Sequence, residues 1–174
     1  MKKRTIKNKK ILIIGGGGFI GHNLALKLRS LGAKVNVIDS LHINNLYSVK
    51  KNENCLPYPK LALKILNQRF SLLKKNKIEL KVADARNYKL LSKIIKSLKP
   101  QIIIHLAAIS HANRSNNDPH STFDHSLRTL QNSLDNAKNN VEQFIFLSSS
   151  MVYGNFNKQK VKESDQCNPL GIYG

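Results

Sequence analysis

The sequence has little cysteine and little glycine for its length. Only two cysteines, Cys55 and Cys167, occur among 174 residues, and no C-x-x-C pair is present. This excludes a zinc ribbon and a disulfide framework, and it favours a reducing compartment such as the cytoplasm. Nine glycines are too few for a collagen-like chain. With 41% hydrophobic residues, the chain has enough apolar material for the core of one globular domain.

Long apolar runs are missing as well. The longest run of low polarity covers residues 11–21 and contains four consecutive glycines, and it is about half as long as a membrane-spanning helix. The basic residues before it loosely resemble the start of a signal peptide, but the apolar stretch is too short and no small-residue cleavage site follows. We therefore expect a cytoplasmic protein with no membrane span and no export.

Acidic residues are scarce: ten stand against 29 lysines and arginines, which gives a formal net charge of +19. Such a charge is typical of proteins that bind nucleic acid. Only six of the basic residues are arginine, however, and arginine is the side chain that best matches phosphate and base edges. We attribute the charge mainly to AT-rich coding and expect no nucleic-acid partner. A nucleotide-binding module that binds RNA through its basic surface is the alternative from another functional class.

Two kinds of segment alternate along the chain. Short runs rich in β-branched residues predict strands, and longer segments with apolar residues at helical spacing predict helices. The expected strands are residues 9–14, 34–38, 78–82, 101–106 and 141–147, and the expected helices are 19–31, 61–75, 88–98 and 122–138. A long polar stretch follows the second strand, and residues 111–119 are expected to form a polar loop.

This alternation predicts an α/β fold with a doubly wound parallel sheet. Each parallel strand pair needs a crossover, and the crossovers cover both faces of the sheet. Ligands of such sheets bind at the carboxyl ends of the strands. We expect residues 1–9 to form a basic N-terminal extension that frays and residues 10–174 to form one domain.

A glycine-rich turn joins the first expected strand to the first helix. Gly15, Gly18 and Gly21 form G-x-x-G-x-x-G, and Gly16 also opens a G-x-G-x-x-G. Such a turn lets the backbone approach a pyrophosphate, which meets free N–H groups of the helix. Asp39 ends the second strand 18 residues after Gly21, where a carboxylate binds both ribose hydroxyls and repels a 2′-phosphate. The pattern favours an NAD site over a turn that is merely flexible.

Further motifs follow in order: ADARN at 83–87, IHLAAISHANRS at 104–115, LSSSMVYG at 147–154 and NPLGIYG at 168–174. With the glycine turn, they make the chain from about residue 10 to 174 resemble the extended short-chain dehydrogenases/reductases. Within that group it is similar to NAD-dependent nucleotide-sugar epimerases and dehydratases, and in its motifs most of all to UDP-sugar 4-epimerases. The resemblance implies a Rossmann-like NAD-binding domain, a UDP-sugar substrate and a homodimer of the full-length protein.

The resemblance also implies the cofactor contacts. Phe19 and Ile20 lie beside the pyrophosphate in this interpretation, and Asp84 and Ala85 beside the adenine. The expected cofactor residues are Gly15, Gly18, Phe19, Ile20, Gly21, Asp39, Asp84, Ala85, Leu106, Ala107, Ala108 and Ser148. The chain departs from the family at 125–129, where HSLRT replaces the usual N-x-x-G-T pattern.

The catalytic serine of the family stands four residues before the tyrosine of V-Y-G, which selects Ser149, and the catalytic tyrosine follows about two dozen residues later, which selects Tyr173. In the implied chemistry, a lysine and the positive cofactor ring lower the pKa of the phenol. The tyrosine takes the proton of the sugar 4-hydroxyl as hydride leaves C4, and the serine bonds the same oxygen. Tyr153 fails as the base because Asn157 stands at its Y-x-x-x-K position.

The chain ends one residue after Tyr173, before the family's lysine and its substrate-binding part. We therefore expect an incomplete NAD-binding domain with little activity of its own, and an inactive remnant is a further possibility. The family's 4,6-dehydratases carry an Asp-Glu pair where Ser150 and Met151 stand here. The sequence thus favours a 4-epimerase, with dehydratases, decarboxylases and reductases of the family as alternatives.

The histidines predict no metal site. The spacings of His111, His120 and His125 match no helical ligand pair, and H-E-x-x-H is not present. His105 lies inside an expected strand, and we interpret it as a core residue. We therefore expect no bound metal.

Overall fold

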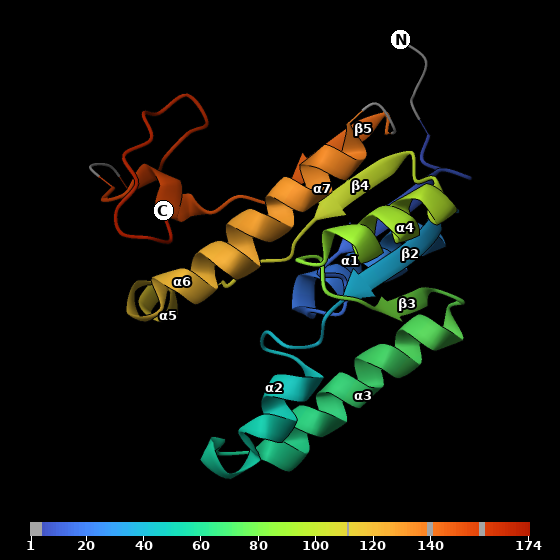
Figure 1. Cartoon of the computed structure of the whole chain (residues 1–174), viewed down its shortest axis with the longest axis horizontal. Helices are drawn as coiled ribbons and strands as arrows, with labels where there is room; N and C mark the ends of the chain where they lie inside the picture. Colours follow the sequence, from blue (N-terminus) through green and yellow to red (C-terminus); the bar gives the residue numbers. More distant parts are fainter. Residues whose placement is uncertain (1–4, 111, 139–140, 157–158) are drawn as a thin grey trace.

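The computed structural model describes residues 5–110, 112–138, 141–156 and 159–174. At its centre lies a parallel sheet in the order β3-β2-β1-β4-β5 (Figure 1). The strands are β1 (Lys10–Ile14), β2 (Lys34–Asp39), β3 (Glu79–Val82), β4 (Ile102–His105) and β5 (Gln143–Phe146). The predicted α/β fold with a parallel sheet is confirmed, and all five strands fall where the sequence places them. The first four residues of the predicted N-terminal extension and His111 lie outside the described residues.

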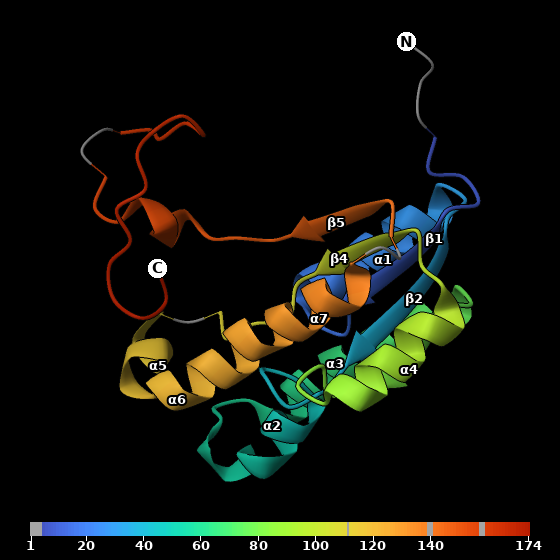
Figure 2. The same ribbon diagram turned by 45° about the horizontal axis from the view of Figure 1, so that its top comes forward.

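Helices cover both faces of the sheet (Figure 2). The α-helices are α1 (Phe19–Ser30), α2 (Leu46–Lys51), α3 (Pro59–Lys75), α4 (Tyr88–Leu98), α5 (Ala112–Asn117), α6 (Pro119–Thr122) and α7 (Thr129–Ala137). The shorter or irregular turns are η1 (Glu53–Cys55), η2 (Phe123–Arg128, a π-helix) and η3 (Ser150–Tyr153). Helices α1 and α3 pack together on one face, and α4 and α7 pack together on the other. No helix in the described ranges has the length and apolar character needed to cross a bilayer.

The side chains of β1 alternate between two cores, which explains its continuous apolar sequence. Ile11 and Ile13 pack in the core beneath α1 and α3, whereas Leu12 and Ile14 pack in the core beneath α4. None of the four is more than 2% exposed. Because burial of one such side chain is worth roughly 1.5–3 kcal/mol, β1 alone contributes a large share of the hydrophobic stabilisation.

Two segments for which apolar spacing predicts no helix, the polar stretch after β2 and residues 111–119, are partly helical. Helix α2 lies in the polar stretch after β2, where Asn45 and Ser48 form a capping box around its first turn. Helix α5 occupies most of the expected loop at 111–119, and Asp118 caps α6 through the backbone N–H of Ser121 at 3.0 Å. The loop prediction for 111–119 is therefore wrong. Polar caps begin α2 and α6, and apolar periodicity does not reveal helices as short as α2, α5 and α6.

His105 ends β4 in the core, as predicted. Its ring is 1% exposed and lies near the rings of Phe144 and Phe146. Its Nε2 lies 3.1 Å from the carbonyl oxygen of Ala107. Burial lowers the pKa of His105 to about 4, so the imidazole is neutral in the folded protein at pH 7.

This buried imidazole predicts a loss of stability in acid. Between the ordinary pKa of about 6.5 and the folded value of about 4, the unfolded chain binds more protons than the folded one. The contribution of neutral His105 to the free energy of unfolding is therefore fully present above pH 6.5. As the pH falls toward 4, the free energy of unfolding decreases by about 3 kcal/mol. His105→Gln should remove this part of the pH dependence of the free energy of unfolding, measured by urea denaturation. The exposed His120 gives the control His120→Gln, which should behave like the wild type. Equal pH dependence in His105→Gln and the wild type would contradict the assignment.

Candidate functional site

The strand register brings the motif residues to one edge of the sheet. Ile14 at the end of β1 pairs with Ile38 on β2 and with His105 on β4. His105 in turn pairs with Phe146 at the end of β5, and Asp39 on β2 pairs with Val82 at the end of β3. The motifs identified above follow the ends of these strands. Their residues therefore converge at the carboxyl edge of the sheet.

A cavity of about 590 Å³ lies at this edge. Every residue that the resemblance assigns to the cofactor lines it: Gly15, Gly18, Phe19, Ile20, Gly21, Asp39, Asp84, Ala85, Leu106, Ala107, Ala108 and Ser148. Of the two expected catalytic residues, Tyr173 lines the cavity and Ser149 does not. The Ser149 hydroxyl instead accepts a hydrogen bond from the backbone N–H of Met151 at 3.2 Å. The structure thus collects all but one of the expected site residues around one space, which we call the large cavity.

The glycine turn forms one wall of the large cavity. Gly15 has φ +82°, and a Cβ there would lie 2.7 Å from the backbone nitrogen of Ala107. A Cβ on Gly21 would lie 2.5 Å from the Cα of Gly16, so these positions are closed to side chains. Gly18 differs, because a Cβ there would meet only the Gly15 carbonyl oxygen at 3.4 Å. Gly18 is also the N-cap of α1, and since no side chain caps this helix, its N-terminus favours an anion.

Asp39 is fixed beside this turn by its neighbours. Its Oδ2 accepts the backbone N–H of Gly17 at 2.9 Å, and its Oδ1 accepts the N–H of Leu41 at 2.8 Å and the Asn45 amide at 3.4 Å. Burial raises the pKa of Asp39, and the three hydrogen bonds oppose that effect. Because a carboxylate oxygen accepts about two hydrogen bonds, Oδ2 keeps one position for a ligand hydroxyl.

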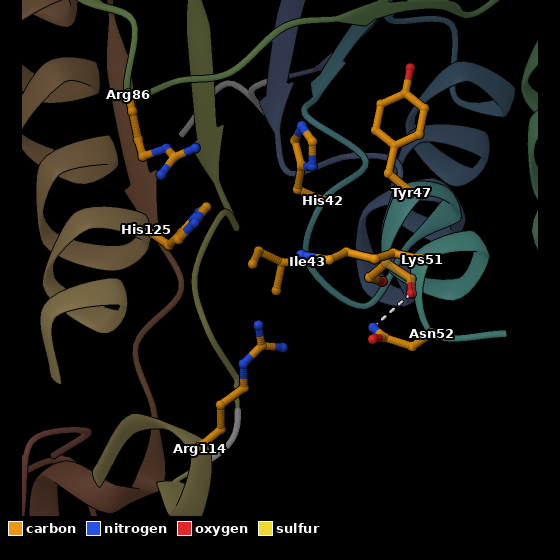
Figure 3. Close-up of a pocket in the computed structure, with 9 residues that line it drawn as sticks. His42, Ile43, Tyr47, Lys51, Asn52, Arg86, Arg114 and His125 are labelled. Atoms are coloured by element: carbon orange, nitrogen blue, oxygen red, sulfur yellow. Dashed lines mark hydrogen bonds between the residues drawn. The ribbon is translucent and has the colours of Figure 1, made fainter. Parts of the chain in front are cut away.

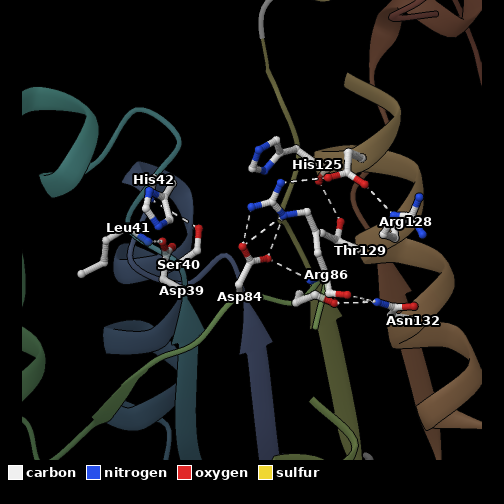
Figure 4. A network of polar contacts seen from close by, with 12 residues as sticks. Asp39, Ser40, Leu41, His42, Asp84, Arg86, His125, Arg128, Thr129 and Asn132 are labelled. Carbon is white, nitrogen blue, oxygen red and sulfur yellow. Dashed lines mark hydrogen bonds and ion pairs between the residues drawn. The ribbon is translucent and has the colours of Figure 1, made fainter. Parts of the chain in front are cut away.

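A chain of ion pairs fixes Asp84 on the opposite side (Figure 4). The Arg86 guanidinium donates to Asp84 at 2.7 Å and to Asp124 at 2.9 Å, and Arg128 donates to Asp124 at 2.5 Å. Burial acts to raise the pKa of Asp84, but Arg86 outweighs it and holds that pKa below its ordinary value. Asn132 on α7 donates to the backbone carbonyl of Arg86 at 2.9 Å. The turn after β3 is thereby tied to η2 and α7.

The segment that departs from the family pattern also reaches the large cavity. His125 and Thr129 both line it, and the Thr129 hydroxyl donates to the His125 carbonyl at 2.8 Å. Burial lowers the pKa of His125, and the positive charge of Arg86 adds to this effect. The HSLRT sequence therefore keeps a place at the wall, although its side chains differ from those of the usual pattern.

Arg69 is a cavity residue that the sequence analysis missed. It comes from α3, and its guanidinium lies 5.7 Å from the centre of the Phe19 ring, within reach of a cation–π interaction. Burial lowers its pKa. In the sequence Arg69 is one polar position of an amphipathic helix, and only the packing of α3 against α1 brings it to the glycine turn.

The metal hypothesis finds no geometric support in the described part of the chain. There, no three side chains of histidine, cysteine, aspartate or glutamate gather closely enough to hold a metal ion. Of the histidines considered above, His111 lies outside the described residues, His120 is exposed and His125 lines the large cavity.

Comparison with known proteins identifies the family. The sequence model of the NAD dependent epimerase/dehydratase family matches residues 11–174. The chain belongs to this family. The resemblance stated from the motifs is therefore confirmed, and so is NAD as the cofactor of the family to which the chain belongs.

Several relatives share this stretch of sequence. Protein CapI of Staphylococcus aureus is 34% identical over 166 residues, which cover 94% of this chain and 45% of CapI. A bifunctional UDP-glucose 4-epimerase and UDP-xylose 4-epimerase of Pisum sativum is 28% identical over 96% of this chain and 44% of its own length. The chain thus spans a little under half the length of these curated relatives.

Solved structures share the fold. The UDP-Glc/GlcNAc 4-epimerase of Campylobacter jejuni superposes with a TM-score of 0.77 at 22% identity, over 96% of this chain and 45% of that one. A UDP-N-acetylglucosamine 4-epimerase of Methanobrevibacter ruminantium gives a TM-score of 0.72 at 27% identity, over 97% and 46%. The Rossmann-like sheet is therefore confirmed, and it corresponds to a little under half of those longer chains.

The large cavity fits the parts of NAD. Gly18 leaves open backbone at the N-terminus of α1, a place that can accommodate a pyrophosphate. Asp39 lies at the end of β2 with a free acceptor position for a ribose hydroxyl. Asp84 and Ala85 border the same space after β3. The chain's own residues thus supply a donor set for the phosphates and an acceptor for the ribose.

The glycines predict two separable defects. Gly18→Ala should leave the fold intact but weaken NAD binding by about tenfold to a hundredfold, because its Cβ enters the large cavity. Gly15→Ala should lower the free energy of unfolding by about 1–3 kcal/mol, because it strains a positive-φ backbone that also touches Ala107. Calorimetric NAD titration and urea denaturation of both variants measure the two effects. A stable Gly18→Ala protein with unchanged NAD affinity would show that the pyrophosphate lies elsewhere.

Proposed function

We propose that this chain is the NAD-binding portion of a nucleotide-sugar 4-epimerase. One observation carries the proposal: the expected cofactor residues and Tyr173 line the same cavity at the carboxyl edge of the sheet. Family membership and relatives named as UDP-sugar 4-epimerases support it. The substrate in this proposal is a UDP-sugar, and the full-length protein is a homodimer.

The cofactor is held by three parts of the large cavity. The N–H groups at the start of α1 bind the pyrophosphate, and Arg69 adds a positive charge beside Phe19. Asp39 accepts one hydroxyl of the adenine-side ribose through the free acceptor position of its Oδ2. Asp84, kept ionised by Arg86, borders the adenine together with Ala85.

The catalytic proposal assigns the proton to Tyr173 and the alignment of the sugar to Ser149. Bound NAD would supply the hydride acceptor for C4 of the sugar and would allow the hydride to return to the opposite face. Tyr173, which lines the large cavity, takes the proton of the 4-hydroxyl and gives it back. Ser149 accepts the N–H of Met151 through its oxygen, and it does not line the large cavity. In this proposal its O–H, which has no acceptor among the described residues, donates to the sugar O4. A phenol with an ordinary pKa near 10 needs a neighbouring cation for this task, and the family pattern supplies a lysine four positions after the tyrosine.

The residues after Ser149 favour epimerisation over dehydration. Loss of water from C5 and C6 requires an acid and a base next to the active hydroxyl residue. Ser150 and Met151 occupy those positions in η3, and neither side chain transfers protons near pH 7. The 4-keto sugar is therefore reduced again at C4 with no elimination.

Cofactor choice tests the role of Asp39. We expect NAD to bind more tightly than NADP, because a 2′-phosphate would meet the Asp39 carboxylate. Asp39→Asn removes the charge and should narrow the NAD/NADP preference by about tenfold or more, measured by calorimetric titration of both cofactors. The ratio of the NAD and NADP affinities is the readout, because a folding defect would weaken the binding of both cofactors alike. NADP binding as tight as NAD binding in the wild type would overturn this assignment.

Reaction type is tested in a longer protein that contains this chain. With UDP-glucose, UDP-galactose or UDP-glucuronate we expect C4 epimers as products and no 4-keto-6-deoxy sugar. Chromatography and NMR identify the products. Tyr173→Phe should reduce turnover by about a hundredfold or more because it removes the proton acceptor. Tyr153→Phe is the matched control and should retain activity. A 4-keto-6-deoxy product, or full activity of Tyr173→Phe, would refute the mechanism.

A further inference from the structure

A second cavity of about 400 Å³ adjoins the large one and shares Ile43 and His125 with it. We call it the basic cavity. Its walls come from separate parts of the chain: His42, Ile43, Tyr47, Ser48, Lys51, Asn52, Arg86, Arg114 and His125. Among the residues that the structure describes, no aspartate or glutamate lines it. Figure 3 shows Arg86, Arg114 and Lys51 extending toward the same space from different sides.

Two of these cations have no internal counterion. Arg86 is balanced, since it pairs with Asp84 and Asp124. Arg114 on α5 and Lys51 on α2 form no ion pair or side-chain hydrogen bond within the described ranges. The charge of Arg114 also contributes, after burial and Arg86, to lowering the pKa of His125. Positive charge thus gathers at this cavity without a protein group to neutralise it.

We propose that the basic cavity binds a phosphate dianion, either inorganic phosphate or a phosphomonoester, at a site distinct from the NAD site. The guanidinium of Arg114 matches a bidentate phosphate contact, and Lys51 supplies a point charge from the opposite wall. Arg86 contributes its N–H groups that Asp84 and Asp124 leave free. Donors that arrive from three elements suit the spread oxygens of a tetrahedral dianion better than the two coplanar oxygens of a carboxylate.

The site lies outside the glycine turn that the cofactor requires. None of the turn glycines lines the basic cavity, and its cations stand on α2, α5 and the segment after β3. Phosphate and NAD should therefore bind together. This proposal does not depend on the proposed function, because the cavity and its charges exist whether or not the large cavity holds NAD.

The test titrates inorganic phosphate into the 174-residue protein by calorimetry, with and without saturating NAD. We expect saturable binding in both conditions. Arg114→Gln and Lys51→Met should each weaken it by about tenfold or more. Lys75→Met removes one charge from the exposed end of α3 and should leave the affinity unchanged. Both Arg114 and Lys51 are exposed, so thermal unfolding should confirm that these variants fold.

Several results would overturn the proposal. If Lys75→Met weakened phosphate binding as much as Arg114→Gln does, phosphate affinity would depend only on the overall charge of the protein. Competition with NAD, or loss of binding in Gly18→Ala but not in Arg114→Gln, would place the phosphate at the glycine turn instead. Absence of saturable binding, or acetate binding as tightly as phosphate, would also refute it. Titration of glycerol 3-phosphate distinguishes the two forms of the ligand. If glycerol 3-phosphate binds more tightly than inorganic phosphate, the ligand is a phosphomonoester; if it binds more weakly, the ligand is the free ion.

Discussion

Strand β1 pairs in parallel with β2 on one side and with β4 on the other, and its apolar side chains are buried in both cores. The chain leaves β1 through α1 toward one face, whereas it leaves β4 through α5, α6, η2 and α7 toward the other. The two connections therefore diverge at the carboxyl edge of the sheet. In doubly wound sheets this divergence creates the ligand crevice, and here the large cavity occupies it. The position of every other site residue depends on this pairing.

Polar contacts then set the fine positions of the cavity walls. Asp39 joins the end of β2 to Gly17 in the glycine turn and to Asn45 at the start of α2. The Arg86 ion pairs join the turn after β3 to η2. Because the side chains of Arg86, Asp84 and Asp124 are partly exposed, these ion pairs add little to stability. Their effect is to fix the orientation of the carboxylates that face the cavity.

The sequence predicts an element or site residue correctly where the local pattern of residues agrees with the packing of the whole fold. Helix α4 lies at residues 88–98, the range predicted from its apolar spacing and the proline that follows, and Asn87 caps it through the N–H of Leu90. The glycine turn and Asp39 were found because their spacing reflects the strand–turn–helix geometry itself. Helices α2 and α5 are only six residues long and neither buries an apolar side chain, so apolar periodicity does not predict them. Arg69 was missed for a related reason: its contact depends on tertiary packing between α1 and α3.

The placement of arginine refines the interpretation of the net charge. The composition alone suggested that +19 reflects coding bias, because lysine far outnumbers arginine. Yet three of the six arginines, Arg69, Arg86 and Arg114, line the two cavities, and Arg128 holds the ion pair behind them. Among the described lysines, only Lys51 lines either cavity. Apart from Lys51, the lysine charge of the described residues therefore lies outside the two cavities, whereas arginine, the side chain with the fixed donor geometry that anions require, gathers where the sheet opens.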